Sequence, residues 1–297
     1  MKVSIVIASA PDRDAEVLNS LKNVDYDKKD YEAIVVRGLN PSENRNNGIK
    51  KAKGKIIGFI DDDALLDKNI LKNAERFFEN NRDIDIIGGP QLTPKTDGWF
   101  ARVSGYALES YFGTSKMSKR YKVGKLDLNA DENSLTSANC FARRSVFKKI
   151  DGFNVKLYPG EDPEFFARAK KNGFRIAYVP NVVIYHRRRA TLPKFMEQFF
   201  KYGYFRLKKE KFMGTNPGIL FFLPSFFVLY MVLMPFFSMV NYIFLFPFLV
   251  YAVISLFASI FTAFKKLDFL ALFALPFIFL MLHLSYGFGM IYYMIKD

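Results

Sequence analysis

The hydrophobic pattern of this 297-residue chain changes at about residue 190. Before that point, short apolar runs alternate with polar segments that repeat at helical spacing, as in a sheet built from βαβ units. The expected strands cover 3–9, 31–36, 55–60, 84–88, 174–179 and 182–185, and the expected helices cover 14–21, 42–52, 68–79 and 160–171. Further ordered segments are expected at 134–142 and 143–149. We therefore predict an α/β domain over residues 1–190.

The pattern loosens between residues 90 and 130. Aromatic side chains are scattered there, and a basic stretch lies near 115–125. A long irregular segment inside a compact domain is usually a functional lid or disordered. We expect one of these two states for this segment.

The rest of the chain is expected to cross a membrane. Residues 217–295 are almost wholly apolar, and their charged residues are Lys265, Lys266 and Asp268. Three stretches reach the roughly 20 residues that a membrane-crossing helix needs. The three stretches are 217–239, 242–264 and 269–295. The tight, uncharged turn at Asn241 predicts a helical hairpin. A buried apolar bundle of a soluble protein is the alternative, and three consecutive stretches argue against it.

Basic residues set the expected orientation. Lys265 and Lys266 lie between the second and third stretches, and a strongly basic segment precedes the first. Both are cytoplasmic under the positive-inside rule, so the C-terminus is expected outside. The apolar run at 2–8 indicates a first strand rather than a signal peptide, because Pro11 and charged residues follow at once. We predict a multi-pass protein of the cell membrane whose soluble domain faces the cytoplasm.

Residues 192–213 combine one apolar helical face with several lysines. The apolar face holds Phe195, Met196, Phe199, Phe200, Tyr202 and Phe205. A basic amphipathic helix directly before a membrane stretch is typical of a helix that lies in the membrane interface. A packed linker helix is the alternative. The predicted parts of the chain are therefore 1–190, 191–213 and 214–297.

The chain is strongly basic, with 43 Lys and Arg against 29 Asp and Glu. Basic surfaces attract nucleic acids, nucleotide phosphates and anionic lipids. No nucleic-acid-binding motif occurs, so we expect no nucleic-acid partner, and the apolar stretches favour membrane lipids. The single cysteine, Cys140, excludes an internal disulfide and is expected to be a small buried residue. His283, inside the third apolar stretch, is expected to make an interhelical hydrogen bond.

Asp61, Asp62 and Asp63 directly follow the strand expected at 55–60. Open α/β folds bind ligands at the carboxyl ends of parallel strands. Three adjacent carboxylates repel one another unless a cation or solvent compensates, and hard oxygen ligands suit Mg²⁺ or Mn²⁺ carrying a phosphorylated substrate. Alternatively, the carboxylates stabilise the start of a helix near Asp67. The local sequence leaves both interpretations open.

Glu161 and Asp162 open the helix expected at 160–171, with Pro163 in its first turn. An N-cap explains Asp162 and, taken alone, is the better interpretation. A general base that takes the proton of an acceptor hydroxyl is the alternative. His186 precedes three arginines, where a neutral metal ligand would avoid repulsion, although a structural histidine is the simpler explanation.

Five short motifs follow one another along the first domain. In chain order they are Asn44-Arg45-Asn46-Asn47-Gly48-Ile49, Ala52-Lys53-Gly54, Phe59-Ile60-Asp61-Asp62-Asp63, Gly160-Glu161-Asp162 and His186. This order resembles family 2 glycosyltransferases of the GT-A fold, and the resemblance covers essentially residues 1–190. It implies a nucleotide-binding GT-A domain with a mainly parallel sheet, here followed by an interfacial amphipathic helix and about three transmembrane helices.

The resemblance also implies roles for individual residues. Asp61 would face the ribose and diphosphate of a nucleotide-sugar donor and, with Asp63 and His186, would hold Mn²⁺ or Mg²⁺. Asp62 fills the variable position of the family's Asp-x-Asp element beside the nucleotide. Arg45 would lie near the diphosphate.

Other matches concern the nucleobase and the chemical step. Pro11 and Asp12 fall in the loop that borders the base in the family, and Asp162 matches the catalytic base. Relatives usually carry an acidic pair after the second strand, whereas residues 36–39 here read Val-Arg-Gly-Leu. Base recognition is therefore expected to be built differently.

The acceptor is expected on the membrane side. Residues 198–202 (Gln-Phe-Phe-Lys-Tyr) are similar to the Gln-x-x-Arg-Trp element that borders the acceptor in membrane polysaccharide synthases. The residues assigned to acceptor or lipid are Glu161, Arg187, Arg188, Gln198, Lys201 and Tyr202. The basic ones among them would steer an anionic lipid head group towards the site.

Together these features predict a membrane-bound, metal-dependent inverting glycosyltransferase. It would move a sugar from a nucleotide sugar to a lipid-linked polyprenyl saccharide. A polyprenyl-phosphate sugar synthase is the alternative enzyme, and a catalytically silent membrane scaffold is the alternative of another class.

Overall fold

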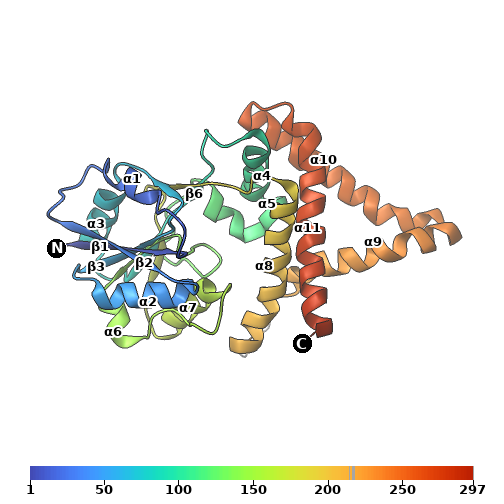
Figure 1. Ribbon diagram of the computed structural model, residues 1–297. Coiled ribbons are helices and arrows are strands. Elements are labelled where there is room, and N and C mark those ends of the chain that lie inside the picture. The colour runs from blue at the N-terminus through green and yellow to red at the C-terminus, as the bar shows by residue number, and fades with distance from the viewer. Residues whose placement is uncertain (214, 216–217, 297) are drawn as a thin grey trace. The chain divides into compact units, whose positions relative to one another are not determined.

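The chain folds into two compact units, shown with their elements labelled in Figure 1. This computed structural model describes residues 1–213, 215 and 218–296. The first unit contains residues 1–94 and 116–187, and the second contains 95–115 and the chain from 188 onward. Segment 95–115 thus belongs to the second unit, although the sequence places it within the first domain. The assignment of catalysis to residues 1–190 stays a prediction.

A six-stranded sheet forms the centre of the first unit, in the order β2-β1-β3-β7-β5-β8. Its strands are β1 (Val3–Ser9), β2 (Tyr31–Arg37), β3 (Ile56–Ile60), β5 (Ile86–Gly88), β7 (Asn139–Arg143) and β8 (Ile176–Tyr178). β1 pairs in parallel with β2 and β3, and β5 pairs in parallel with β8. β7 runs antiparallel to β3 and β5. The sheet is mixed and mostly parallel, which confirms the predicted α/β class.

Two apolar cores cover the two faces of this sheet. Ile5 and Ile7 of β1 belong to one core and Val6 to the other, because successive side chains of a strand point to opposite faces. The covering helices are α1 (Val17–Leu21) and α3 (Ile70–Asn80) on the first face, and α2 (Pro41–Lys51), α6 (Val146–Lys149) and α7 (Glu161–Lys171) on the second (Figure 1). Cys140 is fully buried in the second core, as predicted.

A second, three-stranded sheet lies beside the acidic residues that follow β3. It consists of β4 (Ala64–Leu66), β9 (Ile184–His186) and β6 (Gln91–Leu92). β4 and β9 are antiparallel, and their register places His186 opposite Ala64. This pairing brings His186 next to Asp63, which is more than a hundred residues earlier in the chain.

The segment from 90 to 130 carries regular structure, so the expectation of an irregular or disordered segment is wrong, while a role as a lid stays a prediction. It contains β6, α4 (Trp99–Glu109), α5 (Tyr111–Thr114) and the 3-10 helix η1 (Ser115–Tyr121). α4 buries small and apolar side chains around most of its circumference, including Ala101, Val103 and Leu108. Ser104 and Gly105 are among its buried residues while Trp99 and Tyr106 are not, which obscures the apolar stripe by which an amphipathic helix is recognised from sequence.

Long helices form most of the second unit. They are α8 (Leu192–Met213), α9 (Leu223–Val240), α10 (Phe246–Lys266) and α11 (Ala271–Lys296), with the 3-10 turns η2 (Ile219–Phe221) and η3 (Tyr242–Leu245). α8 has the predicted bounds. α9, α10 with η3, and α11 are long and apolar enough to cross a membrane. Pro217, the predicted start of the first apolar stretch, lies outside the described residues.

Two polar details of the second unit confirm predictions. Asn241 accepts a hydrogen bond from the amide of Ile243 at 2.9 Å and so forms the turn between α9 and α10. His283 of α11 lies 3.0 Å from the hydroxyl of Tyr251 on α10, which is an interhelical hydrogen bond.

Candidate active site

The three aspartates form a loop between two strands rather than a helix cap. β3 ends at Ile60 and β4 begins at Ala64, so Asp61, Asp62 and Asp63 connect the main sheet to the small one. The next helix, α3, begins only at Ile70. The alternative in which the aspartates stabilise that helix is therefore wrong.

Asp61, Asp63 and His186 converge at this loop. A carboxylate oxygen of each aspartate and one ring nitrogen of His186 all lie within 4.8 Å of one another. His186 Nε2 is 3.4 Å from Asp61 Oδ2 and 3.3 Å from Asp63 Oδ1. The sequence predicted this group, and the register between β4 and β9 is what assembles it.

The contacts of His186 fit a divalent cation. Its Nδ1 lies 3.0 Å from the carbonyl oxygen of Arg187, so a neutral ring donates there and turns the Nε2 lone pair towards the two carboxylates. Three lone-pair donors facing one another repel unless a cation, or a proton on the ring, lies between them. Carboxylate oxygens with one imidazole suit Mn²⁺, and the oxygens alone suit Mg²⁺. These residues therefore fit the predicted metal.

Asp62 is turned into the protein. It is 4% exposed, and its carboxylate accepts hydrogen bonds from Ser9 Oγ at 2.7 Å and from Arg13 Nη1 at 3.0 Å. These contacts fasten the acidic loop to the end of β1. Contact between Asp62 and a nucleotide stays a prediction, since both of its oxygens already have protein partners.

Arg13 is a site residue that the sequence reasoning did not assign. Its guanidinium also lies 3.7 Å from Asp63 Oδ2, so it partly neutralises two of the three aspartates. The available signal was its position, because it follows β1 at the same carboxyl edge at which β3 delivers the aspartates.

Arg45 joins the acidic loop to the start of α7. Its Nη2 lies 3.3 Å from Asp61 Oδ1, and its Nη1 lies 2.9 Å from Glu161 Oε1. The side chain is 8% exposed and packs over the ring of Phe153 at 5.3 Å. Burial alone would raise the pKa of Asp61, but His186 and Arg45 hold it below its ordinary value.

Glu161 is buried and engaged on both oxygens. Besides Arg45, it accepts a hydrogen bond from the amide of Gly160 at 3.0 Å. Burial, together with the charge of Asp162, raises the pKa of Glu161 to about 7 even though Arg45 opposes the shift. Its predicted role towards the acceptor stays a prediction, because the structure shows its carboxylate bound within the protein.

The raised pKa of Glu161 predicts a pH-dependent stability. A folded-state pKa above the ordinary value of 4.5 means that protonation favours the folded state, so this contribution is present at low pH. It is lost as pH rises from about 4.5 through about 7. Relative to Glu161→Gln, the melting temperature of the unaltered protein should therefore fall across this window. Thermal unfolding between pH 4.5 and 8 measures the difference.

The matched control for this experiment is Glu79→Gln, which removes an exposed carboxylate at the end of α3. Its melting temperature should keep a constant offset from that of the unaltered protein at every pH. A constant offset for Glu161→Gln as well would contradict the assignment.

Asp162 lies in the first turn of α7 and is not its N-cap. The N-cap residue is Gly160, so the cap interpretation of Asp162 is wrong. Asp162 Oδ2 accepts a hydrogen bond from the amide of Ser137 at 3.0 Å. Its Oδ1 is buried and has no hydrogen-bond partner among the described residues. One oxygen is thus fixed and the other has no partner, and Oδ1 would have to be uncovered by a movement of its surroundings before it could act as a general base.

Ser137 was not identified from the sequence. It precedes β7, and its amide orients the Asp162 carboxylate. A backbone donor is independent of the side chain, so no residue-type signal could have pointed to it.

The predicted nucleobase loop lies at the carboxyl end of β1. Pro11 and Asp12 are both exposed there. Arg37, which ends β2 where relatives are expected to carry acid, donates a hydrogen bond to the carbonyl of Arg13. The carboxyl edges of β1 and β2 thus meet at a basic rather than an acidic border.

The predicted acceptor residues are divided between the two units. Arg187 is in the first unit, where it pairs with Glu16 at 3.3 Å. The backbone amide of Arg188, in the second unit, donates to Asp97 at 3.0 Å. The assignment of these arginines to an acceptor stays a prediction.

The motif on α8 presents polar groups to solvent. Gln198 donates a hydrogen bond to the Tyr202 hydroxyl at 2.9 Å, and Lys201 pairs with Glu197 at 2.5 Å. Tyr202 is 40% exposed, and its ring packs on that of Phe199 of the same apolar face, with 5.6 Å between the ring centroids. Recognition of an acceptor by these residues stays a prediction.

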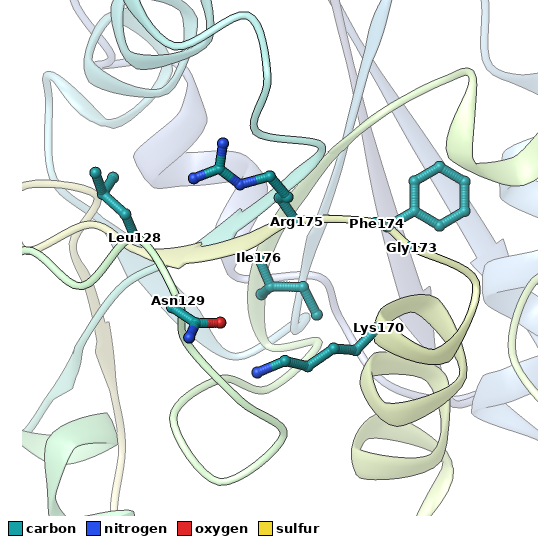
Figure 2. Close-up of a pocket in the computed structure, with 7 residues that line it drawn as sticks. All are labelled: Leu128, Asn129, Lys170, Gly173, Phe174, Arg175 and Ile176. Atoms are coloured by element: carbon teal, nitrogen blue, oxygen red, sulfur yellow. The ribbon is translucent and has the colours of Figure 1, made fainter.

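A surface cavity of about 350 Å³ lies away from these residues, at the C-terminal end of α7 (Figure 2). Lys170, Phe174 and Arg175 are among its lining residues, and Figure 2 shows Lys170 extending towards the segment of Asn129. None of the predicted site residues lines it. The candidate site is thus the acidic loop with α7, not this cavity.

Comparisons with known proteins show the family and the fold of this chain. Residues 1–204 match the family described as "Glycosyltransferase like family 2". The chain is similar to the O-antigen chain rhamnosyltransferase RfbN of Salmonella typhimurium, with 26% identity over 211 residues, which are 69% of this chain and 62% of that protein. It is 28% identical to the O-antigen chain rhamnosyltransferase WbaN of Salmonella anatum over 56% of this chain and 54% of that one. The chain thus spans less than two thirds of the length of these relatives.

Solved structures with a similar fold include the mannosyltransferase PcManGT from Pyrobaculum calidifontis in complex with GDP-Man and Mn²⁺. Its TM-score is 0.57 at 14% identity, with all of this chain and 88% of that chain covered. S. aureus TarS in complex with UDP gives a TM-score of 0.50 at 18% identity, covering 67% of this chain and 64% of that one. These likenesses establish the GT-A fold, and the match over residues 1–204 establishes that the chain belongs to glycosyltransferase family 2.

Proposed function

We propose that this protein is a metal-dependent inverting glycosyltransferase that works at a membrane. It would transfer a sugar from a nucleotide-sugar donor to a lipid-linked polyprenyl saccharide. The observation that carries the proposal is the convergence of Asp61, Asp63 and His186, with Arg45 linking Asp61 to Glu161, the residue that precedes Asp162 in the chain. Donor binding and proton removal thus have separate residues in one site.

On the donor side, Asp61, Asp63 and His186 would hold Mn²⁺ or Mg²⁺. The bound cation would neutralise the charge that develops on the departing nucleoside diphosphate. Arg45 holds Asp61 in place from within the protein, and Arg13 does the same for Asp62. The loop is thereby preorganised before a donor arrives, which limits the ordering that binding requires.

On the acceptor side, Asp162 would take the proton of the attacking hydroxyl through Oδ1. Its other oxygen is bound to the Ser137 amide, so rotation of the carboxylate is restricted. A single displacement of this kind inverts the configuration at the anomeric carbon. The base therefore needs no second carboxylate to act as a nucleophile.

Two observations support a lipid-linked acceptor. The second unit holds three helices that are long and apolar enough to cross a membrane. The similar proteins RfbN and WbaN carry names that describe transfer onto an O-antigen chain. A cytoplasmic orientation of the site and a polyprenyl saccharide as acceptor are part of this proposal, and a polyprenyl phosphate is the competing acceptor.

The donor half of the proposal predicts metal-dependent nucleotide binding. UDP, GDP and dTDP should each be tested with Mn²⁺, with Mg²⁺ and with a chelator. The matching diphosphate should raise the melting temperature only when metal is present, and at a hundredfold excess over its Kd the stabilisation is about 2.7 kcal/mol. Thermal unfolding of the full chain measures the effect.

The variants sharpen this experiment. Asp63→Ala should abolish the shift, because it removes one of the three converging ligands. Glu79→Gln, an exposed position at the C-terminal end of α3, should retain it. Equal stabilisation in chelator would show that the diphosphate does not bind through a metal, and no shift with any diphosphate would favour a silent scaffold.

A further inference from the structure

α9, α10 and α11 have similar hydropathy, but they differ in how much of each helix is buried within the protein. In an apolar 18-residue stretch of each helix, 11% is buried within the protein in α9 and in α10 with η3, against 44% in α11. α11 packs along α8, and the two backbones approach closely through glycines. A Cβ at Gly203 would collide with the carbonyl of Tyr286, and one at Gly289 would collide with that of Phe200.

Placing α8 in the hydrocarbon core of a membrane would bury many charged side chains. Its charged residues are Lys194, Glu197, Lys201, Arg206, Lys208, Lys209, Glu210 and Lys211. Arg206 Nε lies 3.4 Å from the hydroxyl of Tyr286, a residue in the middle part of α11. If α11 crossed the membrane, Arg206 would lie deep in the bilayer, where a charged residue costs about 2.5–3.5 kcal/mol. The partner of α11 therefore belongs at the membrane surface.

Contacts with the start of α9 also place the middle of α11 at the membrane surface. Ser225, in the first turn of α9, donates a hydrogen bond to the carbonyl of Gly287 at 3.4 Å. The carbonyl of Pro224 would meet a Cβ placed at Gly287. The beginning of the α9 crossing and the middle of α11 thus lie at one depth.

The start of α11 lies at that depth too. α9 and α10 are joined by the turn at Asn241, so a chain that crosses in α9 returns to the same face by the end of α10 at Lys266. Only residues 267–270 separate this end from Ala271. Ala271 and Gly287 lie about 24 Å apart along a helix that rises 1.5 Å per residue. A helix with two such distant points at one surface runs along that surface.

We infer that α11 lies in the membrane interface beside α8 and that the chain crosses the bilayer as a single hairpin of α9 and α10. Figure 1 shows α8 and α11 side by side, with α9 and α10 leading away from them to a common turn. The lengths agree, since 18 residues of α9 and 21 of α10 span about 27 and 31 Å against a hydrocarbon core of about 30 Å. The C-terminal end at Lys296 then lies on the same face as Lys265, not on the opposite face that hydropathy predicts.

The partner of this two-helix surface is a lipid interface with anionic head groups. α11 presents Phe273, Phe277 and Phe288 outward, at 79%, 51% and 47% exposure. Lys201 and Lys211 of α8, the helix that packs along α11, are exposed too. Apolar side chains with flanking lysines are the combination that holds a helix in the interface of an anionic membrane.

Cysteine labelling tests the inference on the full chain in membranes. Lys265→Cys, Lys296→Cys and Met239→Cys each add one exposed thiol, and Met239 lies at the hairpin end of α9. The unaltered chain supplies the background, because Cys140 is fully buried. A membrane-impermeant maleimide is added to vesicles of each orientation, so that each face of the membrane is tested separately. It should label Lys296→Cys and Lys265→Cys from the same face, and Met239→Cys from the opposite face. Labelling of Lys296→Cys together with Met239→Cys, or of all three from one face, overturns the inference.

A depth measurement gives an independent result. In a Trp99→Phe background, Phe277→Trp and Phe288→Trp place the single tryptophan at two outward positions about 16 Å apart along α11. Lipids brominated at different chain depths should quench both with the same shallow profile. Profiles that differ in depth between the two positions mean that α11 crosses, and they overturn the inference.

Discussion

Replacing Asp162 by Asn should lower the turnover number about 10²- to 10⁴-fold, the usual contribution of a positioned general base. The amide has the shape of the carboxylate, and its oxygen can still accept the hydrogen bond from the Ser137 amide. It cannot take a proton. The KM for the donor and the metal-dependent thermal shift with nucleoside diphosphate should therefore stay close to those of the unaltered protein. Steady-state kinetics with a lipid-linked saccharide acceptor measure the change.

The same variant separates the two possible acceptors. A polyprenyl phosphate is already ionised at neutral pH and needs no base, so with that acceptor Asp162→Asn should cost much less activity. A large loss with the saccharide acceptor supports the proposed function. Activity only with polyprenyl phosphate, and little affected by Asp162→Asn, would identify the protein as a polyprenyl-phosphate sugar synthase. Glu79→Gln should leave either activity unchanged.

Replacing Arg45 by Met should destabilise the fold by about 3–5 kcal/mol, the range for breaking one side of a buried ion pair. The methionine fills much of the space but leaves Glu161, whose side chain is 6% exposed, without its cationic partner. Asp61, with 32% of its side chain exposed, loses a partner too but can be hydrated. The melting temperature of the full chain should fall clearly, and it should fall further as pH rises and Glu161 ionises.

Two companion variants show whether the buried charge is the cause. Arg175→Met removes an ion pair with Asp83 in which both side chains are more than half exposed, and it should cost about 1 kcal/mol or less. Arg45→Met combined with Glu161→Gln should regain part of the loss, because it removes the carboxylate left without a partner. A double variant as unstable as Arg45→Met alone would mean that packing of the Arg45 side chain, not its charge, accounts for the effect.

Much of the fold followed from local pattern. The strands of the first unit alternate or are continuously apolar, and β1, β2 and β3 begin or end within two residues of their predicted bounds. The helices α2 and α3 are bounded by polar and charged residues and were placed almost as well. α4 was missed because Ser104 and Gly105 stand among its buried positions while Trp99 and Tyr106 do not, so residue type does not mark its buried face.

The candidate site likewise contains residues that the sequence identified and residues that it did not. Asp61, Asp63, Asp162 and His186 were named from the sequence as candidate ligands or bases, and the resemblance to family 2 motifs assigned their roles and added Arg45. Arg13 and Ser137 were not, since their importance comes from position. Arg13 matters because β1 and β3 are neighbours in the sheet, and Ser137 matters because its backbone amide meets α7.

The sequence by itself determined the fold class, the family and the identity of the acidic and apolar segments, because each of these depends on short-range order along the chain. The tertiary structure alone decided which carboxylate oxygens are free. Asp62 and Glu161 carry the same group as Asp162, but protein donors occupy both of their oxygens, whereas Oδ1 of Asp162 has no hydrogen-bond partner among the described residues. The tertiary structure also distinguishes α11 from α9 and α10, although all three have similar hydropathy. α11 contacts Arg206 of α8 and the first turn of α9, and these contacts are what place it at the membrane surface in our inference.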